Sequence, residues 1–223
     1  MRIPERLLVG VPDHVDGRML GIAEGAGARV IHRDRMWHYT EGIENWAPIW
    51  TGHGIRILPG PSSIWLDAEG RRLPAPCLPG FDTLSTLEHI LETDHDYSWF
   101  ILNQRIIEKE FALSGSEQNP DLTGRSIRGV LGRLKKGAPP PVEAFKLKGA
   151  DFIVERRRPE LVARMNELAG SSLLDADAVG AVIAARDREL ANGFGKDAQI
   201  ALIRAARRYR GDRLIRVAPP HAI

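Results

Sequence analysis

The chain has 223 residues, of which 43% are hydrophobic, and its 31 basic side chains nearly balance its 29 acidic ones. This composition can build the core of one large or two small domains, and it excludes an intrinsically disordered chain. The net charge of +2 gives no electrostatic reason to expect nucleic acid or an anionic membrane as a partner.

A single cysteine, Cys77, excludes an internal disulfide and is typical of a reducing compartment. No apolar run reaches the roughly 20 residues that a membrane span requires. The first residues, MRIPERLLVGVPDH, lack the apolar region of a signal peptide. We therefore expect a cytoplasmic protein without a membrane span, and the sequence leaves its oligomeric state open.

The first predicted element is a helix over residues 15–28. Met19, Leu20 and Ile22 recur there at helical spacing, and Asp16 is well placed as the N-cap. Residues 29–32, Arg-Val-Ile-His, are predicted to follow as a short strand.

An aromatic-rich window follows, from Arg35 to Leu73. It opens with the polar turn His38-Tyr39-Thr40-Glu41-Gly42 and closes with two extended segments, GIRILPG and SSIWLDAEGRRL. The Ala-Glu-Gly of the second segment predicts a tight turn. A polar turn held over a small sheet by aromatic residues is typical of a binding site, but the same tryptophans could equally fill a core.

The rest of the chain is predicted to be mostly helical. Residues 74–80 contain three prolines and predict a connector. The longest helix, from Asp175 or Asp177 to Leu190, is predicted to turn Val179, Val182 and Ile183 inward and residues 186–189 toward solvent. The other predicted helices cover residues 83–91 (capped by Asp82 or Thr83), 103–111, 126–134, 142–148, 159–170 and 196–208. The other predicted strands cover residues 97–102, 152–154 and 213–217, and residues 114–124 are predicted to form a polar loop.

Several kinds of chemistry have no motif here. There is no HExxH, no CxxC and no G-x-S-x-G elbow, so neither a metal site nor a hydrolase triad is predicted. The pair Gly25 and Gly27 is too short for a dinucleotide fingerprint. The arginines of residues 204–216 have acidic neighbours and no interleaved aromatic residues, and we expect no nucleic-acid partner.

Several stretches resemble one flavoprotein family. Residues 15–28 look like a D-G-x-x-M-x-x-x-A-G-A helix, residues 36–40 like an H-P-T turn, and residues 59–73 like a G-x-x-x-V-N-x-x-G-R-R-F hairpin. Residues 174–197 echo a late helix and its G-x-D-x-x-F-G tail. These motifs resemble the fumarate reductase, succinate dehydrogenase flavoprotein and 3-ketosteroid dehydrogenase family, in its steroid-dehydrogenase-like branch of FAD-binding dehydrogenases.

The resemblance implies an α+β fold, the cap (substrate) domain of a two-domain flavoprotein. Residues 1–32 are expected to be a remnant of the FAD-binding α/β domain, residues 33–205 the cap domain, and residues 206–223 a return strand. The family's G-x-G-x-x-G start and T-x-G-G-L end do not occur in this sequence. We therefore expect an incomplete chain that is inactive by itself and does not hold FAD tightly. The alternative is a free-standing binding or interaction module without catalytic activity.

The resemblance also implies roles for single residues. Asp16 and Gly17 would contact FAD, while His38, Tyr39 and Thr40 would line the substrate. Residues 74–87 contain no arginine to shuttle a proton as in the dicarboxylate enzymes, so Tyr39 becomes the candidate acid or base. A small, flat hydrophobic substrate would suit the tryptophans Trp37, Trp46, Trp50 and Trp65. The predicted function is that of an FAD-dependent dehydrogenase acting on a CH–CH bond of a steroid-like molecule.

Overall fold

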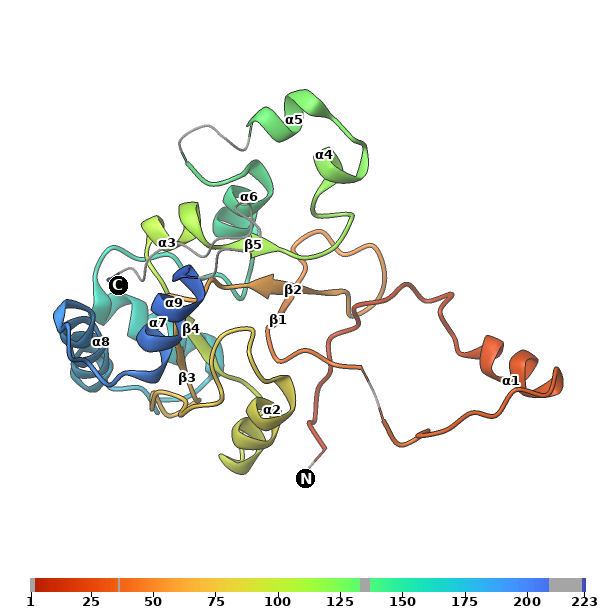
Figure 1. Cartoon of the computed structure of the whole chain (residues 1–223), viewed down its shortest axis with the longest axis horizontal. Coiled ribbons are helices and arrows are strands. Elements are labelled where there is room, and N and C mark those ends of the chain that lie inside the picture. Colours follow the sequence, from red (N-terminus) through yellow and green to blue (C-terminus); the bar gives the residue numbers. More distant parts are fainter. Residues whose placement is uncertain (1–2, 36, 133–136, 209–221) are drawn as a thin grey trace.

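In the computed structural model, which describes residues 3–35, 37–132, 137–208 and 222–223, three short strands follow the first helix, two further strands lie between helices, and helices follow the last strand (Figure 1). The helices are α1 (Arg18–Gly25), α2 (Thr83–Glu92), α3 (Gln104–Lys109), α4 (Pro120–Thr123), α5 (Ile127–Gly132), α6 (Pro140–Lys148), α7 (Arg158–Ala169), α8 (Ala176–Ala191) and α9 (Ala198–Arg208). The strands are β1 (Gly42–Glu44), β2 (Gly54–Leu58), β3 (Ile64–Leu66), β4 (Trp99–Ile101) and β5 (Ala112–Leu113). This mixture agrees with the predicted α+β class.

The strands form two small antiparallel sheets. In the first, β2 lies between β1 and β5, with Ile43 opposite Ile55 and Ile57 opposite Leu113. In the second, β3 pairs with β4, with Trp65 opposite Phe100. The two extended segments predicted between residues 54 and 73 therefore both form strands, but in different sheets.

The predicted tight turn is confirmed at residues 67–71. Gly70 has φ 81°, a conformation that costs glycine little. The buried Asp67 Oδ1 accepts from the amides of Glu69 (3.0 Å) and Arg71 (2.9 Å). The chain then returns, and the Leu73 amide donates to the Trp65 carbonyl at 2.9 Å.

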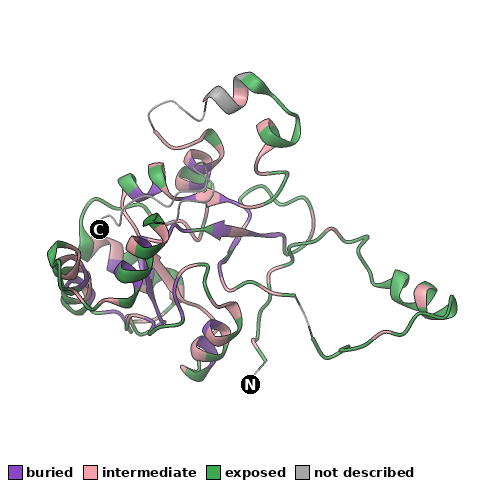
Figure 2. Cartoon of the chain, viewed as in Figure 1, coloured by how far each residue is buried: buried purple, intermediate pink, exposed green. Residues whose placement is uncertain are grey.

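Each sheet has its own core, seen as the purple segments of Figure 2. Ile43, Ile55 and Ile57 of the first sheet pack with the fully buried Phe145 of α6. Ile64 and Leu66 of the second sheet pack with Val162 and Met165 of α7 and with Val179 of α8. Helix spacing predicted the inward position of Val179 in α8 correctly.

Local capping chemistry explains where α2, α3 and α8 begin. The side chains of Asp82, Asn103 and Asp175 accept from the amides of Ser85, Ile106 and Ala178, three residues further on. Helix α7 ends at Gly170, which has φ 59°. The predicted starts of α2 and α8 and the predicted end of α7 are therefore confirmed.

Three predicted elements are wrong. Residues 29–32 form no strand, and His32 has φ 53°. Residues 152–154 form no strand either, although Phe152 packs edge-on against Phe111 with ring centroids 5.7 Å apart. The loop predicted over residues 114–124 contains the short helix α4. The strand predicted at residues 213–217 lies outside the described residues.

Helix α1 projects away from the two cores (Figure 1). None of its residues is buried, so its predicted apolar stripe has no partner among the described residues. The N-cap is Gly17, not Asp16 as predicted. Asp16 instead accepts from the Arg18 amide at 3.1 Å, two residues further on, in a local turn that precedes the helix. Within the described part of the chain, every helix is too short or too polar to cross a bilayer.

Candidate functional site

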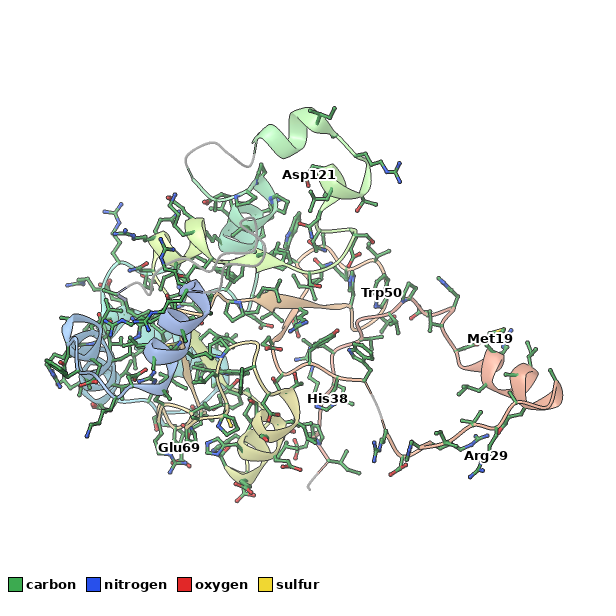
Figure 3. All side chains as sticks on the ribbon, viewed as in Figure 1. Met19, Arg29, His38, Trp50, Glu69 and Asp121 are labelled. Carbon is green, nitrogen blue, oxygen red and sulfur yellow. The ribbon has the colours of Figure 1, made fainter. Side chains whose placement is uncertain are left out.

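The predicted turn at His38, Tyr39 and Thr40 lies directly before β1, and Figure 3 shows His38 close to the first sheet. The antiparallel pairing continues beyond β1, because the Ile57 amide donates to the Glu41 carbonyl at 2.9 Å. The sheet therefore fixes the backbone of the turn. His38 and Thr40 are half-buried, and Tyr39 is 44% exposed.

Arg56 of β2 covers the ring of Tyr39. Its guanidinium carbon lies 3.9 Å from the ring centroid, a cation–π contact, and Trp37 meets the same ring edge-on at 6.2 Å. The Tyr39 side chain is thus held between a cation and an indole while it stays open to solvent. That is a suitable setting for a group that exchanges a proton with a bound molecule.

Glu41 is a functional candidate that the sequence prediction missed. Its side chain is 3% exposed, and it lies on the same face of the strand as the buried Ile43. Glu41 Oε2 lies 3.6 Å from Arg56 Nε, which is too long for a hydrogen bond, and both atoms are buried without one. The alternation of Glu41, Gly42 and Ile43 could have placed this carboxylate on the core face.

Glu41 forms one wall of a shallow groove of about 160 Å³. The other walls are Leu58, the Pro59–Pro61 turn, the Pro79–Gly80 turn and Glu110. The groove therefore combines apolar proline surfaces with two carboxylates, next to the predicted substrate turn.

Glu110 fixes the turn that forms one wall of the groove. Its two carboxylate oxygens accept from Ser62 N and Ser62 Oγ, each at 2.8 Å. Gly60 has φ 88°, and a Cβ at this position would lie 2.5 Å from Glu110 Cβ. Only glycine allows the turn to approach Glu110 so closely.

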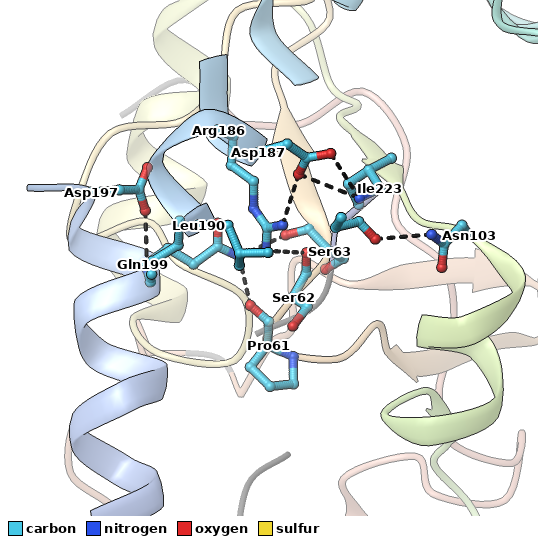
Figure 4. A network of polar contacts seen from close by, with 12 residues as sticks. Pro61, Ser62, Ser63, Asn103, Arg186, Asp187, Leu190, Asp197, Gln199 and Ile223 are labelled. Atoms are coloured by element: carbon cyan, nitrogen blue, oxygen red, sulfur yellow. Dashed lines mark hydrogen bonds and ion pairs between the residues drawn. The ribbon is translucent and has the colours of Figure 1, made fainter. Parts of the chain in front are cut away.

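A buried polar network also holds the same turn (Figure 4). Gln199 of α9 donates through Nε2 to the carbonyls of Pro61 (2.6 Å) and Ser63 (2.7 Å), and Arg186 Nη2 donates to the Ser62 carbonyl at 2.9 Å. Gln199 Oε1 accepts from Arg72 at 2.7 Å. The carbonyls of Pro61, Ser62 and Ser63 are thus all bonded to side chains of α8 and α9.

The prediction that Arg186 faces solvent is wrong, because its side chain is fully buried. Arg186 lies seven residues after Val179, and this spacing returns it to the core face of α8. Burial lowers the pKa of the Arg186 guanidinium, although the hydrogen bond to Asp187 at 3.1 Å and the charge of Asp187 act in the opposite direction.

Asp197 anchors the α9 end of this network. It pairs with Arg72 and accepts from the Ile200 amide at 3.0 Å. Burial alone would raise the pKa of Asp197, but the hydrogen bonds from Arg72 and Ile200 and the charges of Arg72 and Arg186 outweigh burial and lower it. Asp197 therefore stays ionised in the folded protein.

The two predicted cofactor residues, Asp16 and Gly17, lie at the start of α1, which is apart from β1 and the turn that precedes it (Figure 1). Both are exposed, and Asp16 pairs with Arg18 at 2.6 Å. Gly17 has φ 80°, and a Cβ there would meet open space. The described residues do not bring the predicted cofactor and substrate groups together.

The four tryptophans assigned to a flat substrate have separate partners. Trp65 is buried and stacks on Phe100 at 4.5 Å, so it belongs to the core. Trp46 meets Phe145 edge-on, and Trp50 stacks on His53 at 3.7 Å. Only Trp37, which is 84% exposed, contacts the ring of Tyr39.

Two other predicted features have structural roles. Cys77 is buried, and burial raises the pKa of its thiol, so it remains protonated and unreactive. Arg204, from the predicted basic cluster, donates to the Leu190 carbonyl at 2.8 Å and thereby satisfies the end of α8. In the described residues no three His, Cys, Asp or Glu side chains gather as a metal site.

His53 is expected to make folding stability depend on pH. Its Nδ1 accepts from the Ile49 amide at 3.1 Å and lies 3.1 Å from Asn45 Nδ2. Burial lowers the pKa of His53, although Glu117 acts in the opposite direction. Below pH 6.5 His53 is therefore protonated more fully in the unfolded chain than in the folded chain. The free energy of unfolding should then fall as the pH drops, by at most about 1.4 kcal/mol per pH unit.

Urea unfolding at a series of pH values measures this slope. In His53→Asn the amide oxygen can take over the acceptor role of Nδ1, and the slope between pH 7.5 and 5.5 should decrease. An equal slope in both proteins would contradict this role for His53. The lowered pKa of Asp197 adds a further loss of stability only in more acidic solution, below the ordinary aspartate pKa of 3.8.

Comparison with known proteins identifies the family. The family model described as "FAD binding domain" matches residues 2–222. The chain belongs to this FAD-binding family. FAD is the family's cofactor, and the predicted resemblance to FAD-binding oxidoreductases is confirmed.

Relatives within the family share 62% identity with the whole chain. They are a KsdD-like steroid dehydrogenase of Mycolicibacterium smegmatis and two proteins of that description from Mycobacterium tuberculosis. The chain spans 41% of the first relative and 39% of the other two. No solved structure matches the chain.

Proposed function

We propose that this chain is the cap part of an FAD-dependent dehydrogenase that acts on a CH–CH bond of a steroid-like hydrophobic substrate. The observation that carries the proposal is the 62% identity to KsdD-like steroid dehydrogenases along the entire chain. In this proposal residues 33–205 form the cap, and residues 1–32 and 206–223 belong to the FAD-binding domain.

The exposed residues of the N-terminal region support this division. Met19, Leu20 and Ile22 of α1 are 70%, 51% and 62% exposed, and Val9 and Val11 are also exposed. Apolar side chains of this density mark a surface that packs against another protein segment. In the proposal that segment is the remainder of the FAD-binding domain, which the relatives' additional length would supply.

Asp16 and Gly17 fit one edge of a flavin site, because both are exposed and the space where a Cβ of residue 17 would lie is empty. Bound FAD would supply the acceptor for the substrate hydride. Tyr39 then acts as the acid or base that exchanges a proton with the substrate, while the Arg56 guanidinium over its ring orients it. His38 and Thr40 line the substrate beside it.

The helices from residue 159 to residue 208 act in this proposal as a lid over the substrate. Arg186 and Gln199 bind three successive carbonyls of residues 61–63, so hydrogen bonds connect the lid helices directly to the groove wall.

A chimera tests the proposal. The chain replaces the corresponding segment of the Mycolicibacterium smegmatis relative, to which it is 62% identical, and flavin absorbance and dye reduction with a 3-ketosteroid are measured. We expect a yellow, active chimera, and a colourless product from the 223-residue chain alone. A folded chimera that binds flavin but reduces no dye with steroids would rule out the steroid substrate, and a yellow isolated chain would rule out the division into domains.

A further inference from the structure

The groove beside Glu41 is a place where buried polar atoms have no partner in the described chain. Glu41 Oε2, Thr40 Oγ1 and Arg56 Nε are all buried without a hydrogen bond. Buried polar groups in folded proteins are nearly always satisfied, because an unmade hydrogen bond is costly. Of these three residues Glu41 lines the groove, where a bound molecule can supply the missing hydrogen-bond partner of its carboxylate.

The charges around Glu41 decide what kind of partner fits. Arg56 Nε lies 3.6 Å from Glu41 Oε2 and balances its charge, so no second cation is needed. The missing component is a neutral hydrogen-bond donor that reaches the carboxylate oxygen. A hydroxyl group has this property.

The walls of the groove decide what carries the hydroxyl. Pro59, Pro61, Pro79 and the half-exposed Leu58 present carbon surfaces. Glu110 also lines the groove, but its oxygens accept from Ser62 N and Ser62 Oγ. Apolar walls with one open acceptor fit a saturated ring that bears a single hydroxyl.

We propose that Glu41 accepts a hydrogen bond from a ring hydroxyl of the substrate, whose hydroxyl-bearing end packs against the prolines of the groove. This names a further substrate-binding residue and rests on the function proposed above. The groove volume of about 160 Å³ is roughly half that of the smallest typical ligand pockets. It therefore receives one end of a steroid-sized molecule, and the remainder extends toward Tyr39.

Two probes that differ at one group test the contact. Testosterone carries a 17-hydroxyl, and androstenedione carries a ketone, which cannot donate, in its place. Titration of the 223-residue chain, followed by tryptophan fluorescence, should give about tenfold tighter binding of testosterone. Equal affinities, or no binding of either steroid, would overturn the proposal. This test uses the unsubstituted chain, so it does not depend on whether a variant of Glu41 folds.

Substitution of Glu41 then assigns the preference to this residue. In Glu41→Leu the ratio of the two affinities should fall to about one, because the hydroxyl contact is lost; the loss of the Arg56 ion pair affects both steroids alike and leaves their ratio unchanged. Glu41→Gln keeps a neutral acceptor and should give an intermediate ratio. Glu69→Leu, at the exposed end of the 67–71 turn, is the matched control and should keep the full ratio. An unchanged ratio in Glu41→Leu would refute the contact.

The chimera separates this inference from the proposed function. A chimera without flavin or turnover contradicts the proposed function, whereas the affinity ratio on the isolated chain still tests Glu41. In an active chimera, Glu41→Leu should raise the KM for testosterone about tenfold, with flavin content unchanged. If Glu41→Leu lost flavin while the ratio of the testosterone and androstenedione affinities stayed unchanged, Glu41 would contact the cofactor and not the steroid, and the proposal would be overturned.

Discussion

Replacing Arg186 by alanine is expected to lower the free energy of unfolding by about 3–4 kcal/mol. The guanidinium is fully buried between the Ser62 carbonyl, at 2.9 Å, and the Asp187 carboxylate, at 3.1 Å. Its removal leaves the Ser62 carbonyl and the half-buried Asp187 carboxylate without this donor. It also leaves a cavity beside the core of the second sheet. Urea unfolding followed by circular dichroism measures the loss.

Two further variants give this prediction its controls. Arg188→Ala removes an exposed arginine two residues further along α8 and should change stability by less than about 0.5 kcal/mol. Arg186→Met retains most of the volume but no donor, so it should recover only the part of the loss that is due to the cavity. Arg186→Ala as stable as Arg188→Ala would show that the network contributes nothing to stability.

In the active chimera, Tyr39→Phe is expected to lower kcat about 100- to 10,000-fold, the range associated with loss of a general acid or base. The substitution removes only the hydroxyl and keeps the ring under Arg56, 3.9 Å from the guanidinium carbon. The KM should change much less than kcat, because the apolar contacts of the ring remain. Steady-state dye reduction with a 3-ketosteroid measures both constants.

Tyr97→Phe is the matched control for this variant. Tyr97 is half-buried and meets Trp99 edge-on at 5.5 Å, far along the chain from the substrate turn. Its variant should keep kcat within about twofold, since this tyrosine has no part in the proposed proton transfer. If Tyr39→Phe retained the same kcat as Tyr97→Phe, with equal flavin content, the acid or base would have to be another residue.

The sequence predicted features that depend on neighbouring residues. Asp82 and Asp175 cap helices because their side chains accept from amides three residues ahead, and the turn at residues 67–71 needs only Asp67 and Gly70. The family resemblance rests on motifs that are also short and continuous in sequence, and the membership of the chain in the FAD-binding family is confirmed.

The sequence failed where structure depends on distant partners. Residues 29–32 and 152–154 have the composition of strands, but a strand forms only when another backbone pairs with it. Arg186 was assigned to solvent because charged residues are usually exposed, yet its acceptor Ser62 lies 124 residues away. Glu41 was missed because its role depends on Arg56 and on two proline turns that only the fold brings to it.

The connection between β2 and β3 also restricts how the chain can vary in length. The carbonyls of residues 61–63 are bonded to Arg186 and Gln199, and the amide of Ser62 is bonded to Glu110. An inserted or deleted residue here would shift these groups past their partners and rotate every following side chain of β3 to the opposite face. We therefore expect related sequences to keep the length of this connection.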